Sequence, residues 1–275
     1  MTNEIYPCLW FDGKAKAAAE FYCKIFKNSS IISDTAMVVL FEINGKKIMG
    51  LNGGPMYKIN PSISMFVHCT SIDECSRIWN ELSEGATILM ELNKYPWSEQ
   101  YGWLQDKFGF TWQVMKGDKD NMMPSLLFTG DQLGKAEEAM NFYTDIFQHS
   151  AVGVKNYYPD ETPFAGKISY AEFNLGQYPL VAMDGPSEHN FTFSEGVSFV
   201  VNCGSQSEID YYWNKFVTDG GKESMCGWCK DKYGVSWQVV PSNIGKLLGN
   251  PGNGQRAMQA MFKMKKLDIA ALENA

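Results

Sequence analysis

Apolar and polar residues alternate, or recur with helical spacing, in short blocks whose order predicts the fold. The segment IYPCLWF (5–11) alternates and ends at Asp-Gly, which predicts a strand that enters a turn. The Ala-rich segment 14–26 carries apolar residues at helical spacing and predicts a helix. Apolar runs lie on both sides of Asn44 and Gly45, and this dipeptide predicts a two-residue hairpin turn.

A second block of the same kind follows. The segment SISMFVHC (62–69) predicts another strand. A helix is expected to begin after Ser71, which can form a capping box with Glu74. Residues 102–106 and 110–115 then predict a hairpin. The first part of the chain is therefore expected to run strand, helix, three strands, and then strand, helix, two strands, with room for one more short strand.

This order occurs twice, because blocks of the first half recur in the second half. YGWLQDKFGFTWQVM (101–115) aligns without a gap with CGWCKDKYGVSWQVV (226–240). EFYCKIFKNSS (20–30) likewise recurs as NFYTDIFQHSA (141–151). Matching blocks in the same order predict a tandem duplication. The predicted division is a first domain 1–118, a second domain 119–245 and a C-terminal helical tail 246–275.

The segments PCLWFDGKAKAAAEFYCKIF, FEINGKKIMGLNGGP and CGWCKDKYGVSWQVVP resemble the glyoxalase/bleomycin-resistance (vicinal-oxygen-chelate) superfamily, in particular its PhnB-like, 3-demethylubiquinone 3-methyltransferase-like branch. The resemblance implies an α+β fold of tandem glyoxalase-like domains, built from four βαβββ units that form curved mixed sheets and close two cups. Relatives of one-copy length pair as dimers. Pairing of the two domains within this chain is therefore expected, and a homodimer remains an alternative.

The resemblance also implies where a metal ion would bind. Metal-dependent members place ligands on the first strand, on the strand that opens the second unit and on the last strand. The matching positions are Pro7, Ser64 and Gln113 in the first copy and Pro124, Ser198 and Gln238 in the second. Proline has no side-chain donor, and hydroxyl and amide groups are weak ligands for transition metals. We therefore expect neither a metal nor a cofactor, and a metal-dependent enzyme remains the alternative if these positions are misassigned.

Strand alternation predicts which side chains line the cups. The expected lining is apolar with a few neutral polar groups, which suits a flat or aromatic small molecule held by burial and a few hydrogen bonds. The predicted ligand-binding residues are Leu9, Phe11, Ser64, Phe66, Gln113, Leu126, Phe128, Ser198, Val200 and Gln238. A structural dimerisation module, with its cups filled by side chains, is an alternative.

An enzyme of the same superfamily is the other alternative, of the lyase, isomerase, dioxygenase or methyltransferase-labelled kind. Such an enzyme would use side-chain acids in place of a metal. The candidate catalytic residues are Glu42, Glu172 and His68, each of which has a solvent-facing or structural role as its alternative. The methyltransferase label lacks support in the sequence, because the Gly-rich LNGGP (51–55) is followed by proline and no helix is expected there.

Composition and sequence patterns argue against two classes of partner, nucleic acids and membranes. The formal net charge of −7 argues against a nucleic-acid partner, which needs a basic face. No apolar run approaches the roughly 20 residues of a membrane span, and the N-terminus shows no signal-peptide pattern, so we expect a cytoplasmic protein without a membrane partner.

Cys226 and Cys229 form a C-x-x-C pair, but Tyr101 and Leu104 occupy these positions in the first copy. The expected state is free, mostly buried thiols, with a redox or zinc role as the weaker alternative.

Overall fold

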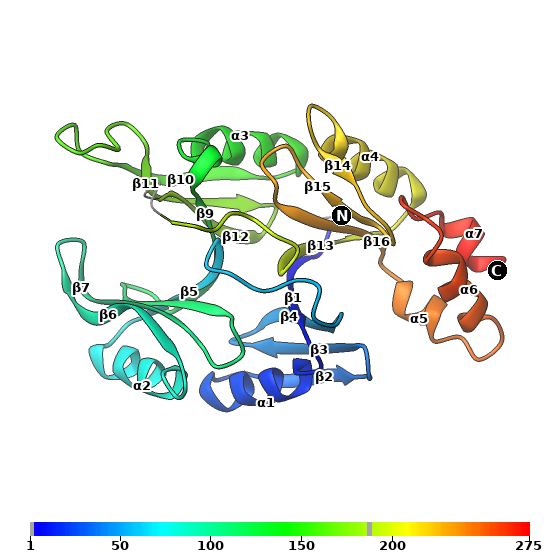
Figure 1. The fold of residues 1–275 in the computed structure, drawn as a ribbon, viewed down its shortest axis with the longest axis horizontal. Coiled ribbons are helices and arrows are strands. Elements are labelled where there is room, and N and C mark those ends of the chain that lie inside the picture. The colour runs from blue at the N-terminus through cyan, green and yellow to red at the C-terminus, as the bar shows by residue number, and fades with distance from the viewer. Residues whose placement is uncertain (1–2, 186–188) are drawn as a thin grey trace. The chain divides into compact units, whose positions relative to one another are not determined.

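The computed structural model describes residues 3–185 and 189–275, which fold into two compact units. The larger unit is Pro7–Val197, and the smaller unit is Ser198–Ala275 together with the start of the chain up to Tyr6. Along the described chain, a βαβββ unit occurs four times, with strands in mixed parallel and antiparallel pairing (Figure 1). The predicted α+β fold of four such units is confirmed. The domain bounds read from the repeat stay a prediction.

The first βαβββ unit forms a four-stranded arrangement covered by one helix. Its elements are β1 (Ile5–Phe11), α1 (Ala15–Ile25), β2 (Ser30–Asp34), β3 (Val38–Ile43) and β4 (Lys46–Asn52), with the strands in the order β1-β4-β3-β2. The hairpin between β3 and β4 turns at Asn44 and Gly45, whose φ angles of 49° and 70° are left-handed. Two successive left-handed residues are what the predicted Asn-Gly turn requires, so this prediction is confirmed.

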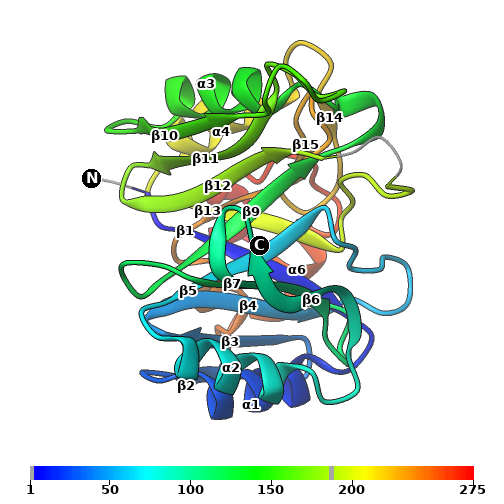
Figure 2. The same ribbon diagram turned by 90° about the vertical axis from the view of Figure 1, so that its left-hand side faces the viewer.

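The second and third βαβββ units share one curved sheet of eight strands within the described part of the larger unit (Figure 2). The sheet order is β10-β11-β12-β9-β5-β8-β7-β6. The strands from the first copy are β5 (Ile63–Cys69), β6 (Thr87–Tyr95), β7 (Ser98–Gln105) and β8 (Thr111–Lys116). Those from the second copy are β9 (Asn121–Phe128), β10 (Ala151–Tyr157), β11 (Ile168–Leu175) and β12 (Tyr178–Asp184). The antiparallel pairing of β5 with β9 therefore joins the two copies of the sequence repeat.

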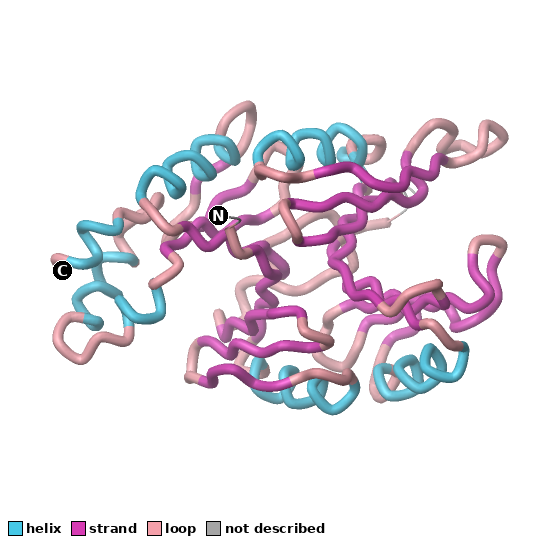
Figure 3. The backbone as a smooth tube through the Cα atoms, turned by 180° about the vertical axis from the view of Figure 1, so that it is seen from behind, coloured by secondary structure: helices cyan, strands magenta, loops and turns pink. Residues whose placement is uncertain are grey.

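Helices α2 (Ile72–Leu82) and α3 (Ala136–Ile146) pack against one face of this sheet (Figure 3). A short 3-10 helix, Gly130–Gln132, precedes α3. The hydroxyl of Ser71 caps α2 by accepting a hydrogen bond of 3.2 Å from the backbone N–H of Glu74, as the capping signal predicts.

The smaller unit contains the fourth βαβββ unit and the tail. Its elements are β13 (Val197–Cys203), α4 (Gln206–Val217), β14 (Lys222–Glu223), β15 (Trp228–Lys230), β16 (Ser236–Pro241), α5 (Ile244–Leu248), α6 (Gly254–Met261) and α7 (Ile269–Glu273). The tail packs on its own unit, because the backbone N–H groups of Cys226 and Gly227 donate to the carbonyls of Met264 and Lys265, at 2.7 and 2.8 Å. Among the described helices, none is both long and apolar enough to cross a membrane.

The repeated D-K-x-G motif holds a buried carboxylate that fastens the last hairpin of each copy. Asp106 accepts hydrogen bonds from the backbone N–H groups of Phe108 and Phe110 at 2.8 and 3.1 Å. Its second oxygen accepts from the indole N–H of Trp112 at 2.8 Å and from the hydroxyl of Tyr22 at 2.7 Å. Burial raises the pKa of Asp106, and these hydrogen bonds oppose the rise.

Asp231 makes the equivalent turn in the smaller unit. It accepts from the backbone N–H groups of Tyr233 and Val235 at 2.9 and 3.1 Å and from the indole of Trp237 at 2.8 Å. The recurrence of Asp and Trp in the sequence thus has a structural reason.

Candidate functional site

The site is built on the face of the eight-stranded sheet that lies opposite α2 and α3, here named the cup face. A side chain at Gly102 would collide with Trp79 of α2, so position 102 faces the helices. Its two neighbours in the strand, Tyr101 and Trp103, therefore project from the cup face. In the same way, Phe173 stacks on Tyr143 of α3 and so faces the helices. Its neighbours in β11, Glu172 and Asn174, therefore lie on the cup face.

The pairing of the strands extends the cup face over both copies of the repeat. In paired strands, directly opposite residues project to the same side. Ser64 lies opposite Ser125, and Phe66 lies opposite both Met123 and Gln113. The central strands of the sheet therefore present one continuous surface.

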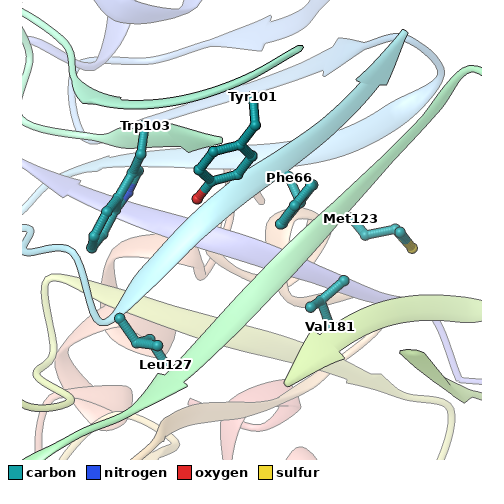
Figure 4. Close-up of a cluster of buried hydrophobic side chains, with 6 residues drawn as sticks. All are labelled: Phe66, Tyr101, Trp103, Met123, Leu127 and Val181. Atoms are coloured by element: carbon teal, nitrogen blue, oxygen red, sulfur yellow. The ribbon is translucent and has the colours of Figure 1, made fainter. Parts of the chain in front are cut away.

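This surface carries a buried hydrophobic cluster (Figure 4). Its members are Phe66, Tyr101, Trp103, Met123, Leu127 and Val181, contributed by β5, β7, β9 and β12. Partly buried residues pack around them, namely Met90, Tyr95, Met115, Tyr170, Met183 and Phe191. The cluster is aromatic and methionine-rich, a composition that adapts to flat apolar molecules.

A chain of hydrogen bonds runs beneath the aromatic rings. The hydroxyl of Tyr101 donates to Oε1 of Gln113 at 2.7 Å. Nε2 of the same amide donates to the hydroxyl oxygen of Ser64 at 2.7 Å. These two bonds fix the amide orientation, and Ser64, which accepts here, can direct its own hydroxyl hydrogen to a further acceptor.

Three buried polar atoms on the cup face lack a hydrogen-bond partner among the described residues. They are Nε1 of Trp103, Oγ of Ser125 and Nε2 of His68. The side chains of Trp103 and Ser125 are 8% and 0% exposed, so solvent does not satisfy them readily. A buried, unpaired donor or acceptor costs about 1–3 kcal/mol of folding stability. Each of these atoms can still form a hydrogen bond to a bound molecule.

Two of the three candidate catalytic residues, His68 and Glu172, lie on the cup face. The hydroxyl of Tyr170 donates to a carboxylate oxygen of Glu172 at 2.6 Å, and Glu172 pairs in register with Val181 of the cup face. The ring of Phe66 contacts both His68, at 4.9 Å, and Tyr170, at 5.7 Å, between centroids. Burial lowers the pKa of His68, although the charge of Glu172 acts in the opposite direction. Burial, followed by the carboxylate of Glu172, raises the pKa of Tyr170.

The third candidate, Glu42, lies elsewhere. It is on β3, opposite Lys47 of β4 and Ser30 of β2, in the four-stranded arrangement. His68 and Glu172 therefore share the cup face, and Glu42 does not lie on it.

The predicted lining divides between the two faces. Ser64, Phe66 and Gln113 lie on the cup face, as the alternation predicts. Leu126 and Phe128 lie on the opposite face, because Leu126 pairs with Ile63 and the residue opposite Ser64 is Ser125. The sequence-based prediction took Pro124, Leu126 and Phe128 as the cup side of this strand, whereas the structure places Ser125 there. A shift of one residue moves every side chain of a strand to the other face.

The same shift applies to Leu9 and Phe11 on β1. Leu9 lies opposite Gly50, where an added side chain would meet both Ala15 of α1 and the ring of Phe11. These two residues therefore face α1 and contribute to the core.

The remaining predicted residues share one face of the smaller unit. Nε2 of Gln238 donates to the hydroxyl of Ser198 at 3.0 Å, and Val200 lies opposite Gln238 in the parallel pair. Trp237, the neighbour of Gln238 in the strand, stacks on Phe216 of α4, which places the three residues on the face away from that helix.

Sequence reasoning missed several residues of the cup face. Tyr101 and Trp103 could have been found from their alternation around Gly102, although the plain expectation for a recurring tryptophan is the core. Met123, Ser125 and the β11–β12 residues depend on the pairing of β9 with β5 and β12. No local signal in the sequence indicates that pairing.

The residues at the expected metal positions do not fit a transition-metal ion. Ser64 and Gln113 supply a hydroxyl and an amide that already bond to each other, and Pro124 faces away from the cup. Ser125, which takes its place on the cup face, adds only another hydroxyl. Within residues 3–185 and 189–275, no group of three or more His, Cys, Asp or Glu side chains is placed to hold a metal ion. Such ions need at least three converging imidazole, carboxylate or thiolate donors.

Cys226 and Cys229 are free thiols in the structure. Burial raises the pKa of both, which disfavours the reactive thiolate. Cys226 adopts a left-handed φ of 60° at the point where its backbone binds the tail.

Four βαβββ units with curved sheets, and a cup face lined by both copies, define a glyoxalase-like fold. The model of the family described as 3-demethylubiquinone-9 3-methyltransferase matches residues 3–115 and again residues 120–240. The chain belongs to this family, and the two matches confirm the tandem duplication.

Glyoxalase I from Zea mays shares this fold, and two bacterial proteins match shorter parts of the chain. Glyoxalase I from Zea mays is 12% identical and superposes with a TM-score of 0.56 over 88% of this chain and 94% of its own. A PhnB protein from Bacillus cereus, titled a 3-demethylubiquinone-9 3-methyltransferase, is 30% identical over 41% of this chain and 98% of its own, with a TM-score of 0.39. Protein PA1353 from Pseudomonas aeruginosa is 22% identical over 40% of this chain and 93% of its own, with a TM-score of 0.35. No curated protein matches the chain in sequence.

Proposed function

We propose that the chain binds a flat, mainly apolar small molecule on the cup face of the eight-stranded sheet, without the help of a metal ion. The observation that carries this proposal is the aromatic cluster of the cup face together with the unpaired polar atoms of Trp103 and Ser125. Apolar walls with a few placed polar groups are the usual composition of small-molecule sites. The methyl transfer in the family's name is not part of the proposal, because the glycines after β4 lead into a turn at residues 55–56 and not into a helix.

The test is ligand binding in metal-free buffer. Planar bicyclic compounds should raise the melting temperature of protein that has been dialysed against a chelator, and metal analysis of protein purified without chelator should find no stoichiometric ion. Met183→Trp should weaken binding about tenfold, because the larger ring fills space beside the cluster. Met56→Trp, at a side chain that is 76% exposed, is the matched control and should bind normally. Stabilisation that depends on an added metal would contradict the proposal.

A second function is proton transfer without a metal, and one observation favours it. Glu172 is held by Tyr170 on the cup face and lies close enough to His68 to influence its pKa. A carboxylate there could remove a proton from the carbon next to a ligand carbonyl, leaving an enolate that takes a proton back from the carboxyl group. In D2O, catalysed exchange at that carbon of 1-tetralone, followed by NMR, would support this function. Glu172→Gln should abolish the exchange while leaving binding intact. Equal exchange in both proteins would refute it.

A further inference from the structure

The unpaired polar atoms of the cup face differ in the hydrogen bonds that they can form. The hydroxyl of Ser125 can donate or accept, and Nε2 of His68 does one or the other according to the tautomer. The indole N–H of Trp103 can only donate. The chain of bonds from Tyr101 through Gln113 to Ser64 also points one way, with each group donating to the next, so that Ser64 ends the chain with its own O–H.

Ser64 and Ser125 lie directly opposite each other on β5 and β9, both at most 1% exposed. The Cβ atoms of such a pair are about 5 Å apart, so an oxygen that enters between them by displacing the covering side chains would reach both hydroxyl groups. Nε1 of Trp103 and Oγ of Ser125 have no partner among the described residues. An acceptor oxygen would match the indole N–H of Trp103, which can only donate, and the hydroxyl groups of Ser64 and Ser125, which can donate.

The charges of the surface disfavour an anionic acceptor. The strand residues that the register places on this face beside Phe66 and Ser125 include no lysine or arginine, and Glu172 is one of them. A carboxylate or phosphate would therefore be buried without a counter-charge, next to a side chain of its own sign. A neutral oxygen acceptor meets no such penalty.

We infer that the ligand of the cup face is a neutral ring compound with a carbonyl oxygen, such as a cyclic ketone or lactone, whose oxygen accepts from Trp103 and the Ser64–Ser125 pair. This inference rests on the proposed function, since it names the class of molecule that the same surface binds. The chain of hydrogen bonds that ends at Ser64 begins at the hydroxyl of Tyr101. In the smaller unit Cys226 occupies the repeat position of Tyr101, although the Gln238–Ser198 bond is kept. The carbonyl site is therefore assigned to the eight-stranded sheet.

The experiment compares two probes that differ in one carbonyl, 1-tetralone and tetralin, with dissociation constants measured by calorimetry or NMR titration. Tetralone should bind wild-type protein at least about tenfold more tightly than tetralin, because a site built for a hydrogen bond discriminates against a molecule that lacks it. Trp103→Phe and Ser125→Ala should each lower the preference for tetralone, measured as the ratio of the tetralin to the tetralone dissociation constant, about three- to tenfold. Tetralin thus reports, in each variant, whether the apolar surface is intact.

Ser236→Ala is the matched control, because this buried hydroxyl also has no partner among the described residues but belongs to the smaller unit. It should leave the affinity for tetralone unchanged. If the two probes bind wild-type protein equally, the inference is wrong and the proposed function stands. If tetralone binds more tightly but neither variant lowers this preference, the oxygen is held elsewhere and the inference is also wrong. If neither probe binds, the cup is filled by its own side chains, and the proposed function fails together with the inference.

Discussion

Single residues of the repeated motif serve two different purposes in this protein. Asp106 and Trp112 bond to each other on the helix side of the sheet, where they secure a turn and pack in the core. Gln113 follows Trp112 in the strand and points to the cup face, where it bonds to Ser64. One short motif therefore supplies both a structural anchor and the polar part of the candidate site, because neighbouring residues of a strand project to opposite faces.

Replacement of the buried carboxylate should be costly. In Asp106→Asn, an amide NH2 group would face the donors of Trp112 and Tyr22, so one or both would lose their acceptor. We expect a loss of about 2–3 kcal/mol in the free energy of unfolding, measured by urea denaturation. Asp118→Asn, at an exposed position of the same part of the chain, should change it by less than about 0.5 kcal/mol. Similar values for the two variants would show that the buried bonds add little.

At the scale of elements, the turn between β3 and β4 depends on glycine for conformation alone. Gly45 has a left-handed φ of 70°, and a side chain there would meet no atom within 4 Å. Gly45→Ala should therefore destabilise the protein by about 1 kcal/mol through backbone strain without a collision. Gly245→Ala is the control, since that position in α5 is equally open and has no left-handed φ. It should be neutral or slightly stabilising in the same thermal unfolding measurement.

Helix α2 should contribute a pH-dependent part of the stability. Hydrogen bonds from Arg77, followed by Lys27, hold the pKa of Glu74 at about 2, below the value of about 4.3 in an unfolded chain. A lowered folded pKa stabilises the protein above the unfolded value, and this contribution disappears as the pH falls toward the folded value.

Wild-type protein should thus lose more stability than Glu74→Gln between about pH 6 and about pH 3, as read from urea midpoints. Glu161→Gln, at an exposed loop position, should follow the wild type. A Glu74→Gln variant with the wild-type pH profile would contradict the prediction.

At the scale of the whole molecule, the sheet of the larger unit depends on both copies of the repeat. Strand β5 is central in that sheet, with β8 on one side and β9 on the other. A fragment of residues 1–118 would lack β9 and expose the edge of β5, a row of unpaired backbone groups beside apolar side chains.

We expect this fragment to dimerise or aggregate, as measured by light scattering coupled to size-exclusion chromatography. Addition of residues 119–275 as a separate chain should restore a defined complex. A fragment that stays monomeric and folded would show that β5 does not need β9.

Much of this architecture could be predicted from local patterns. Periodicity, the Asn44–Gly45 turn and the Ser71 cap are properties of neighbouring residues, and the structure has each of them where it was expected. The duplication could be read from the chain for the same reason, since each copy keeps its own turn and strand signals.

The candidate site could be predicted only in part. Ser64, Phe66 and Gln113 follow from alternation within their own strands, and they lie on the cup face. Leu126 and Phe128 were assigned to the wrong face, because the phase of β9 is set by its pairing with β5. A local pattern tells which residues of a strand share a side, but the choice of side depends on partners distant in the sequence. Ser64, Trp103, Gln113 and Ser125 come from four strands of the two copies, namely β5, β7, β8 and β9, so their meeting is a property of the folded sheet.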